Sequence, residues 1–294
     1  MTPEGSRRPR LGPGGEGTRA LIVAVVSTAA VFGALAFVVV NAPGWARFQQ
    51  SFLNGPIFWD ALPKVIGRFS INVQLFLIAE VLILALGLLL AVLRSLPGPV
   101  FFPIRLLATI YVDLFRALPG VLVIFMLGFG IPALRIEGVP NDEFFWAVVV
   151  LTLLYSAYVS EVYRAGIESV HPSQMAAARS LGLSQVQALR YVVIPQAVRR
   201  VIPPLLNDFI GLQKDTVLVS FIGLVEIFRE TQILQAARFN FTPYLATALV
   251  FVVMTLPLAR LTDWLVGRER GRRGGNDVGA RRAGRPNRGI SGLL

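Results

Sequence analysis

The sequence predicts an all-α, polytopic membrane protein with about six transmembrane helices, and three observations lead to this prediction. Of the 294 residues, 54% are hydrophobic and only 15% are charged, whereas a soluble domain carries about 25% charged residues. The apolar residues come in long uncharged runs that can cross a bilayer. Arginine gathers at both chain ends and in one polar insert, which favours a cytoplasmic location for these three segments.

The composition also excludes several kinds of function. The chain has no cysteine and a single histidine, His171, so neither thiolate chemistry nor a multi-histidine metal centre is available. No clustered catalytic motif is present, which argues against a membrane-embedded enzyme, and no cofactor is implied. The net charge of +11 reflects cytoplasmic arginine rather than nucleic-acid binding, since no aromatic or recognition motif accompanies it.

The N-terminal part is expected to hold one span and one outer loop. Residues 1–19 are basic and rich in Pro and Gly, as in a disordered leader. Ala20–Val40 is uncharged and long enough to span the membrane, and we prefer a retained helix to a cleaved signal peptide, whose apolar region would be shorter. Residues 41–70 contain Trp45 and Trp59, which suit an extracytoplasmic interface.

Two further spans follow in the middle of the chain. Ile71–Leu93 is the second and ends at Arg94, with Glu80 near its centre. A carboxyl group at that depth must face protein or water, so it either lines a transport path or pairs with a cation on another helix. Ile104–Arg116 is amphipathic and interfacial, and the third span runs from Pro119 to about Leu134.

The last three spans enclose the polar insert and a second outer loop. They are Phe144–Ser160, Pro203–Leu224 and Phe241–Leu265, and the loop is Glu226–Asn240. Residues 266–294 are rich in Arg and Gly and are expected to be a disordered cytoplasmic tail.

The polar insert, Glu161–Pro195, is expected to form two short helices on the cytoplasmic face. His171 or Ser173 can cap a helix that begins near Pro172. Gly182 stands where a left-handed residue would end it. Ser184 can cap a second helix, and Pro195 marks the next break. The simpler alternative is an ordinary interfacial loop.

This insert resembles the EAA loop of ABC importer permeases, whose pattern is E-A-A, three residues, G, nine residues, I-x-L-P. Ala177, Ala178, Gly182 and Pro195 stand at the required spacing, while Ala176 replaces the family glutamate. The resemblance extends over residues 71–265 and is to the polar amino acid uptake branch. The segments that carry it are YVDLFRALP, AYVSEVYRAGIESV, AARSLGLS, IPQAVRRVIPPLLNDFI and LQKDTVLVSFIG.

The resemblance implies a five-helix permease core at 71–265 plus one N-terminal helix, with a cytoplasmic coupling loop at 164–200. It implies the membrane subunit of an ATP-driven importer of a polar amino acid such as glutamate, glutamine or arginine. It further implies cytoplasmic ATPase subunits, a second permease, identical or related, and an extracytoplasmic solute-binding protein. The expected location is the bacterial plasma membrane. The chain itself lacks the phosphate-binding loop G-x-x-x-x-G-K-[ST], so ATP must be hydrolysed on another chain.

Two groups of residues are the candidate sites. The ATPase-coupling residues implied by the resemblance are Gln174, Ala176, Ala177, Ala178, Arg179, Leu181, Gly182 and Pro195. The candidate translocation path comprises Glu80, Asn207, Asp208, Gln213, Lys214, Asp215 and Thr216. The alternative role for these polar residues is helix packing or a subunit interface. The alternative function is a stand-alone channel or ion-coupled carrier that uses Glu80 and Asp215.

Overall fold

The computed structural model describes residues 15–283, and every regular element in this part of the chain is helical. The contacts between residues divide the chain into two units, and the boundary in the sequence lies between Asn54 and Gly55. The first unit contains α1 (Gly15–Val40) and α2 (Trp45–Phe52). The second contains all remaining helices and both candidate sites.

Four helices in the described residues are long and apolar enough to cross a membrane, or five if one bent pair counts as a single span. They are α1, α3 (Gly55–Arg94), α7 (Glu143–Glu168) and α12 (Thr242–Ala283). The protein is therefore an all-helical integral membrane protein. The number six and the cytoplasmic position of both termini stay predictions.

The two arms of the bent pair cover the expected interfacial helix and the expected third span. The pair joins α4 (Phe102–Ala117) to α5 (Gly120–Val123), the π-helix η1 (Ile124–Gly130) and α6 (Ile131–Ala133) at an angle of 110°. The bend has a local cause: Leu118 precedes Pro119 and is extended, with ψ 140°. Proline disfavours the helical region for the residue before it, and Leu118 is extended here, so the helix stops and restarts at Pro119.

Several predicted loops are helical. α3 begins at Gly55 and α2 lies before it, so most of the expected outer loop 41–70 is helix. The expected loop Glu226–Asn240 is α11 (Ile227–Arg238), which Glu226 caps through the backbone amides of Phe228 and Arg229. α12 continues to Ala283 where an irregular tail was expected from 266. Residues 1–14 and 284–294 of the predicted leader and tail lie outside the described residues.

The expected fifth span is divided between two kinds of helix. α10 (Ile194–Asp215) is α-helical and begins nine residues before the predicted start at Pro203, and the 3₁₀-helix η3 (Thr216–Ile222) follows it directly. Pro203 and Pro204 therefore lie inside α10 and do not start it. Its polar residues keep α10 out of the group of strongly apolar helices.

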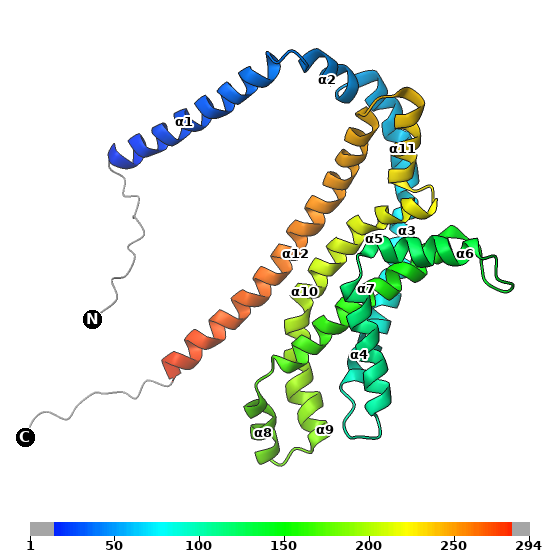
Figure 1. Ribbon diagram of the computed structural model, residues 1–294. Coiled ribbons are helices and arrows are strands. Elements are labelled where there is room, and N and C mark those ends of the chain that lie inside the picture. The colour runs from blue at the N-terminus through cyan, green and yellow to red at the C-terminus, as the bar shows by residue number, and fades with distance from the viewer. Residues whose placement is uncertain (1–14, 284–294) are drawn as a thin grey trace, which may run out of the picture. The chain divides into compact units, whose positions relative to one another are not determined.

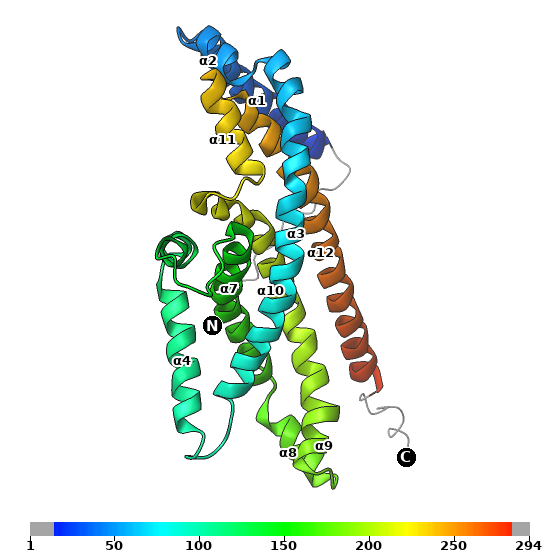
Figure 2. The ribbon, with the colours of Figure 1, turned by 90° about the vertical axis from the view of Figure 1, so that its right-hand side faces the viewer.

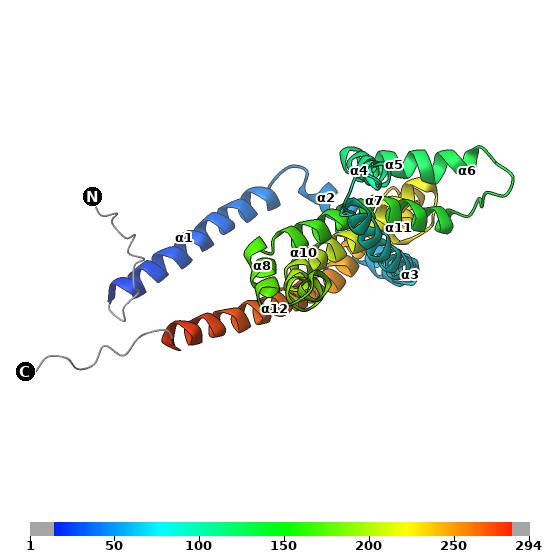
Figure 3. The ribbon, with the colours of Figure 1, turned by 90° about the horizontal axis from the view of Figure 1, so that it is seen from below.

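The core of the second unit forms where α3 and α7 pack along each other (Figure 2). Leu75, Ile83, Leu151 and Val159 are buried in the largest cluster. Gly87 permits the close approach, because a Cβ there would lie 2.7 Å from Val159 Cγ1. Seen from below, α4, α5 and α6 lie on one side of α7 and α12 on the other (Figure 3).

Two groups of short helices lie at opposite ends of the second unit (Figure 1). α8 (Pro172–Ser180) and α9 (Gln185–Ala188) lie at one end, beside the start of α10. α11 lies at the other, where it contacts α3 and α12. A helix bundle therefore connects two exposed ends.

We predict that Gly166 is required where α7 packs on α10. A Cβ at Gly166 would lie 2.1 Å from Val201 Cγ1, and the β-branched side chain has little freedom to move away. Gly166→Ala should destabilise the protein by about 1–3 kcal/mol, the usual cost of overpacking. Thermal unfolding in detergent measures this change.

Two further variants control for this prediction. Gly166→Ala combined with Val201→Ala should recover much of the lost stability, because the second substitution removes the clashing methyl groups. Gly67→Ala has open space around the added carbon and should be neutral or stabilising, because alanine favours helix. Equal unfolding temperatures for Gly166→Ala and the wild type would contradict the packing.

Candidate functional site

The coupling insert forms a compact helical pair, as predicted from its caps. His171 is the N-cap of α8 and its Nδ1 accepts from the backbone amide of Ser173 at 3.2 Å. Ser184 and Gln187 form a reciprocal capping box at the start of α9, with bonds of 3.2 and 2.9 Å. Gly182 joins the two helices with φ at +89°, the left-handed conformation that favours glycine.

The end of the insert differs from the prediction. The second helix is α-helical only from Gln185 to Ala188 and continues as the π-helix η2 (Leu189–Val193). η2 leads directly into α10, where Pro195 occupies the first turn. Pro195 therefore begins a helix and does not break the chain, because the missing amide proton of a proline is not needed in the first turn.

Most predicted coupling residues are exposed and one is a packing residue. Gln174, Ala176, Ala177, Arg179, Leu181, Gly182 and Pro195 are exposed. Ala178 is 5% exposed and belongs to the face of α8 that packs inward. Beneath this face Met175 packs against a small apolar cluster of Val170, Val193 and Ala197. α8 is thus seated on the rest of the chain while its opposite face stays free.

The tip of the helical pair carries apolar side chains that the described part of the chain leaves exposed. Leu181 is 85% exposed and Val186 is 74% exposed. Both lie beside Gly182, at the tip of the helical pair. Exposed apolar residues grouped on a polar insert mark an interaction surface more often than isolated ones do.

An ion-pair cluster links the helices next to this insert. Glu161 on α7 accepts from Arg94 on α3 at 2.6 Å and from Arg164 at 2.7 Å, and Arg116 on α4 lies 3.6 Å away. Arg200 on α10 donates to the carbonyl of Ser169, just after α7. α3, α4, α7 and α10 are therefore tied together near the base of α8.

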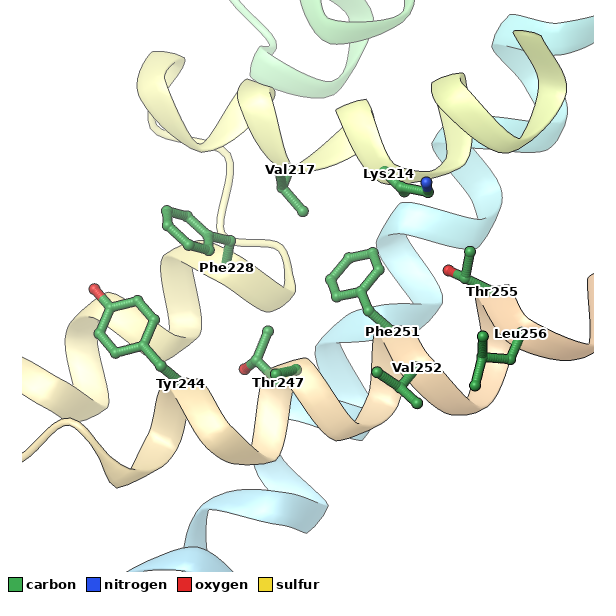
Figure 4. A pocket seen from close by; sticks show the side chains of 10 residues that line it. Lys214, Val217, Phe228, Tyr244, Thr247, Phe251, Val252, Thr255 and Leu256 are labelled. Carbon is green, nitrogen blue, oxygen red and sulfur yellow. The ribbon is translucent and has the colours of Figure 1, made fainter. Parts of the chain in front are cut away.

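The candidate path residues lie on two sides of α10. Asp215 accepts a 2.5 Å hydrogen bond from the Tyr155 hydroxyl on α7. Lys214 instead lines a cavity of about 490 Å³ between α10, η3, α11 and α12, opposite Phe251 and Thr255 (Figure 4). Successive helical residues point about 100° apart, so Lys214 and Asp215 face different neighbours.

The acidic residues gather on the Tyr155 side. Glu80 on α3 is half-buried and lies near enough to Asp208 for the two carboxyl groups to repel each other. Asp208 and Asp215 both act electrostatically on Tyr155. One carboxylate oxygen of Asp208, Oδ2, is buried with no hydrogen-bond partner among the described residues. The bundle therefore holds two carboxyl groups near Tyr155, and a third, Glu80, near Asp208.

The remaining predicted path residues divide into exposed and packed ones. Asn207 is exposed. Gln213 is 8% exposed and accepts from the hydroxyl of Thr255 at 3.0 Å. Thr216 is fully buried and hydrogen-bonded to Asn72 on α3. Gln213 and Thr216 thus contribute to helix packing, which was the alternative considered for these polar residues.

Three polar residues near this site were absent from the sequence-based prediction. Tyr155, Asn72 and Glu226 take part in its hydrogen bonds. Asn72 had a usable signal, because a lone amide in an apolar span needs a partner. Tyr155 had none, because a tyrosine in an apolar helix is common in packing alone.

Comparison with known proteins agrees with this architecture. Residues 83–271 match the family model described as the binding-protein-dependent transport system inner membrane component. The chain is 36% identical to the probable glutamine ABC transporter permease protein GlnM of Bacillus subtilis, over 64% of this chain and 87% of the relative. It is 31% identical to the arginine transport system permease protein ArtQ of the same organism, over 67% and 88%.

A solved structure, titled as an amino acid ABC transporter with histidines, is similar to this chain with a TM-score of 0.64 and 33% identity. The similarity covers 70% of this chain and 94% of the other. Both the packing of the helices and their sequence are therefore shared with proteins of one class. The chain belongs to the family of binding-protein-dependent transport system inner membrane components, the permease subunits of ABC transporters.

Proposed function

We propose that this chain is the permease subunit of an ABC importer that carries a polar amino acid into the cytoplasm. Cytoplasmic ATPase subunits bind the helical pair α8–α9, a second permease completes the membrane channel, and a solute-binding protein delivers the solute from outside. The relatives named for glutamine and arginine support the solute class. The location that follows is the bacterial plasma membrane.

One observation carries the proposal: α8 is seated on the bundle by one face and leaves the opposite face free. Met175 and Ala178 pack inward, while Ala176, Ala177 and Leu181 point away from the chain. Small side chains let a partner helix or groove approach closely. Because Ala176 stands where the family has glutamate, docking here depends on shape and on the backbone at Gly182, not on a salt bridge from that position.

The seating of α8 provides a route for force. ATP closes the ATPase dimer, α8 moves with it, and the ion pairs of Glu161 pass the movement to α3 and α4. The permease then changes from inward-facing to outward-facing. Such a rigid-body change is driven by ligands that bind the two states with different affinity.

The path proposed for the solute lies along α10. An amino acid carries an ammonium group and a carboxylate, and α10 offers the complement of each on separate faces. Asp215, with Tyr155, faces α7, and Lys214 faces the cavity beside α12. Asp208 adds a carboxyl group on the α7 side, and Glu80 on α3 lies near Asp208.

We predict that Gly182→Asp abolishes binding of the ATPase while the permease still inserts in the membrane. Gly182 has φ +89° and open space around it, so the substitution strains the backbone at the tip and does not disturb the core. Gly98→Asp is the matched control, since Gly98 also has open surroundings and φ +87°. A pull-down that retains full ATPase binding in Gly182→Asp would contradict the docking role.

We predict that the purified chain, reconstituted alone in vesicles, moves no amino acid down a gradient. The sequence has no phosphate-binding loop, and opening of the path is proposed to need the ATPase. Adding the ATPase, the solute-binding protein and ATP should start uptake of radiolabelled solute. Uptake by the chain alone would support the alternative, a channel or ion-coupled carrier that uses Glu80 and Asp215.

We predict that Asp215→Asn lowers uptake by roughly tenfold or more, mainly through a higher apparent KM. A hydrogen bond to a charged group contributes about 1.5–3 kcal/mol, and the amide keeps the shape and the Tyr155 contact but loses the charge. Asp263→Asn, an exposed position on α12, is the matched control. A wild-type KM in Asp215→Asn would remove Asp215 from the path.

A further inference from the structure

A buried hydrogen-bond cluster next to Lys214 and Asp215 connects α3, η3 and α11. Asn72 is 2% exposed, and Thr216, Glu226 and Ile227 are fully buried. The side-chain amide of Asn72 donates to Thr216 Oγ1 at 3.1 Å and to Glu226 Oε2 at 2.9 Å, and its carbonyl accepts from the backbone amide of Ile227 at 3.1 Å. One side chain thus makes three bonds to a single stretch of chain.

The three bonds reach the two ends of one loop. Thr216 is the first residue of η3, and Glu226 and Ile227 stand at the start of α11. η3 runs for seven residues from Thr216 to Ile222, and Gly223, whose φ is +98°, follows it. Asn72 on α3 therefore holds the two ends of the segment Thr216–Ile227 together through hydrogen bonds to its first residue and to its last two.

η3 is an unusual element for this position. A 3₁₀-helix rarely exceeds three or four residues, and one within a longer helix often marks a hinge. It advances about 120° and 2.0 Å per residue, against 100° and 1.5 Å for an α-helix. Conversion of seven residues to α-helix would change the relative rotation of its two ends by about 140° and shorten it by about 3.5 Å.

Such a conversion is incompatible with the bonds of Asn72. Thr216 also donates to the carbonyl of Gln213 at 2.9 Å, so its hydroxyl links the last turn of α10 to the cluster. Lys214 and Asp215 lie between Gln213 and Thr216. The Lys214 side chain points toward the cavity and the Asp215 side chain toward Tyr155. These directions therefore depend on the position of Thr216, where η3 begins.

The far end of the segment is firmly held as well. Glu226 accepts from the backbone amides of Phe228 and Arg229 at 2.9 and 2.8 Å. Burial raises the pKa of Glu226, and the bonds from these amides and from Asn72 oppose that rise. Thr231 on α11 is bonded to Thr247 on α12 at 2.5 Å. α11 therefore forms a stable support for the end of the loop.

We propose that Asn72 is a positioning residue for transport: by holding the ends of the Thr216–Ile227 segment together, it sets the directions of Lys214 and Asp215. The second half of this statement rests on the proposed function, because it treats those two residues as part of the path. The first half does not, since it concerns only the closure of the segment.

The test exchanges the two partners in the full transporter, assembled with its ATPase in nanodiscs. Asn72→Asp keeps the acceptor for the Ile227 amide but sets a carboxylate against Glu226. Asn72→Asp combined with Glu226→Gln restores one donor and one acceptor in the opposite order, and it loses the bond that Glu226 Oε2 accepts from the Phe228 amide. Asn141→Asp, exposed before α7, makes the same chemical change away from the cluster. Thr216→Val keeps the shape and removes the hydroxyl, with its bonds to Asn72 and to the Gln213 carbonyl, in case Asn72→Asp fails to fold.

Two measurements give separate answers. Deuterium uptake by peptides that cover Ile227–Thr231 reports closure of the segment directly. Uptake of radiolabelled amino acid, as apparent KM against maximal rate, reports the path. Wild-type ATPase binding in a pull-down shows that assembly is intact.

We expect Asn72→Asp to raise deuterium uptake at α11 and to increase the apparent KM by roughly tenfold, the effect of losing one bond to a buried charged group. Thr216→Val should change both in the same direction by less, and the double variant should recover part of both. Wild-type exchange in both Asn72→Asp and Thr216→Val would overturn the closure. Altered exchange with an unchanged KM would overturn the positioning role. If the wild-type assembly itself transports no amino acid, the proposed function fails, and the exchange measurement still decides whether Asn72 closes the segment.

Discussion

A polar group buried inside a helix bundle has little water to bond with, and this constraint governs the arrangement of α10 and η3. Each buried polar residue there must find a partner within the protein or lose several kcal/mol. Asp215 finds Tyr155, Gln213 finds Thr255, and Thr216 finds Asn72. These partners lie on α7, α12 and α3, so the hydrogen bonds of Gln213, Asp215 and Thr216 fix the position of α10 and η3 against three other helices.

The same constraint applies to the buried polar atoms that have no hydrogen-bond partner among the described residues. The described residues include five buried side chains with an unpaired polar atom, and two of them, Asp208 and Gln213, lie on α10. Lys214 faces a largely apolar cavity beside α12 (Figure 4). α10 therefore carries unpaired polar atoms at Asp208 and Gln213 and, at Lys214, a cation that lines the cavity.

The two ends of the second unit make different contacts. At one end α8 and α9 are capped by their own side chains and packed on a small cluster, so they keep their shape while exposing Leu181 and Val186. At the other end α11 is tied to α3 and α12 through Asn72 and Thr231. Helices α3, α7 and α10 run between them (Figure 1). Movement at either end must pass through these helices, because close-packed interiors transmit displacement.

The sequence by itself determined the class of the protein, the long apolar spans and the shape of the coupling insert, because these depend on local composition and spacing. The caps at His171 and Ser184 and the left-handed Gly182 follow from interactions within a few residues. Only the tertiary structure decided the 3₁₀ segment after Asp215, the 110° bend at Pro119 and the helical content of the expected outer loops. It alone paired Asp215 with Tyr155 and Asn72 with Glu226, residues 60 and 154 positions apart. Contacts at such separations depend on how helices pack, and no local pattern in the chain records them.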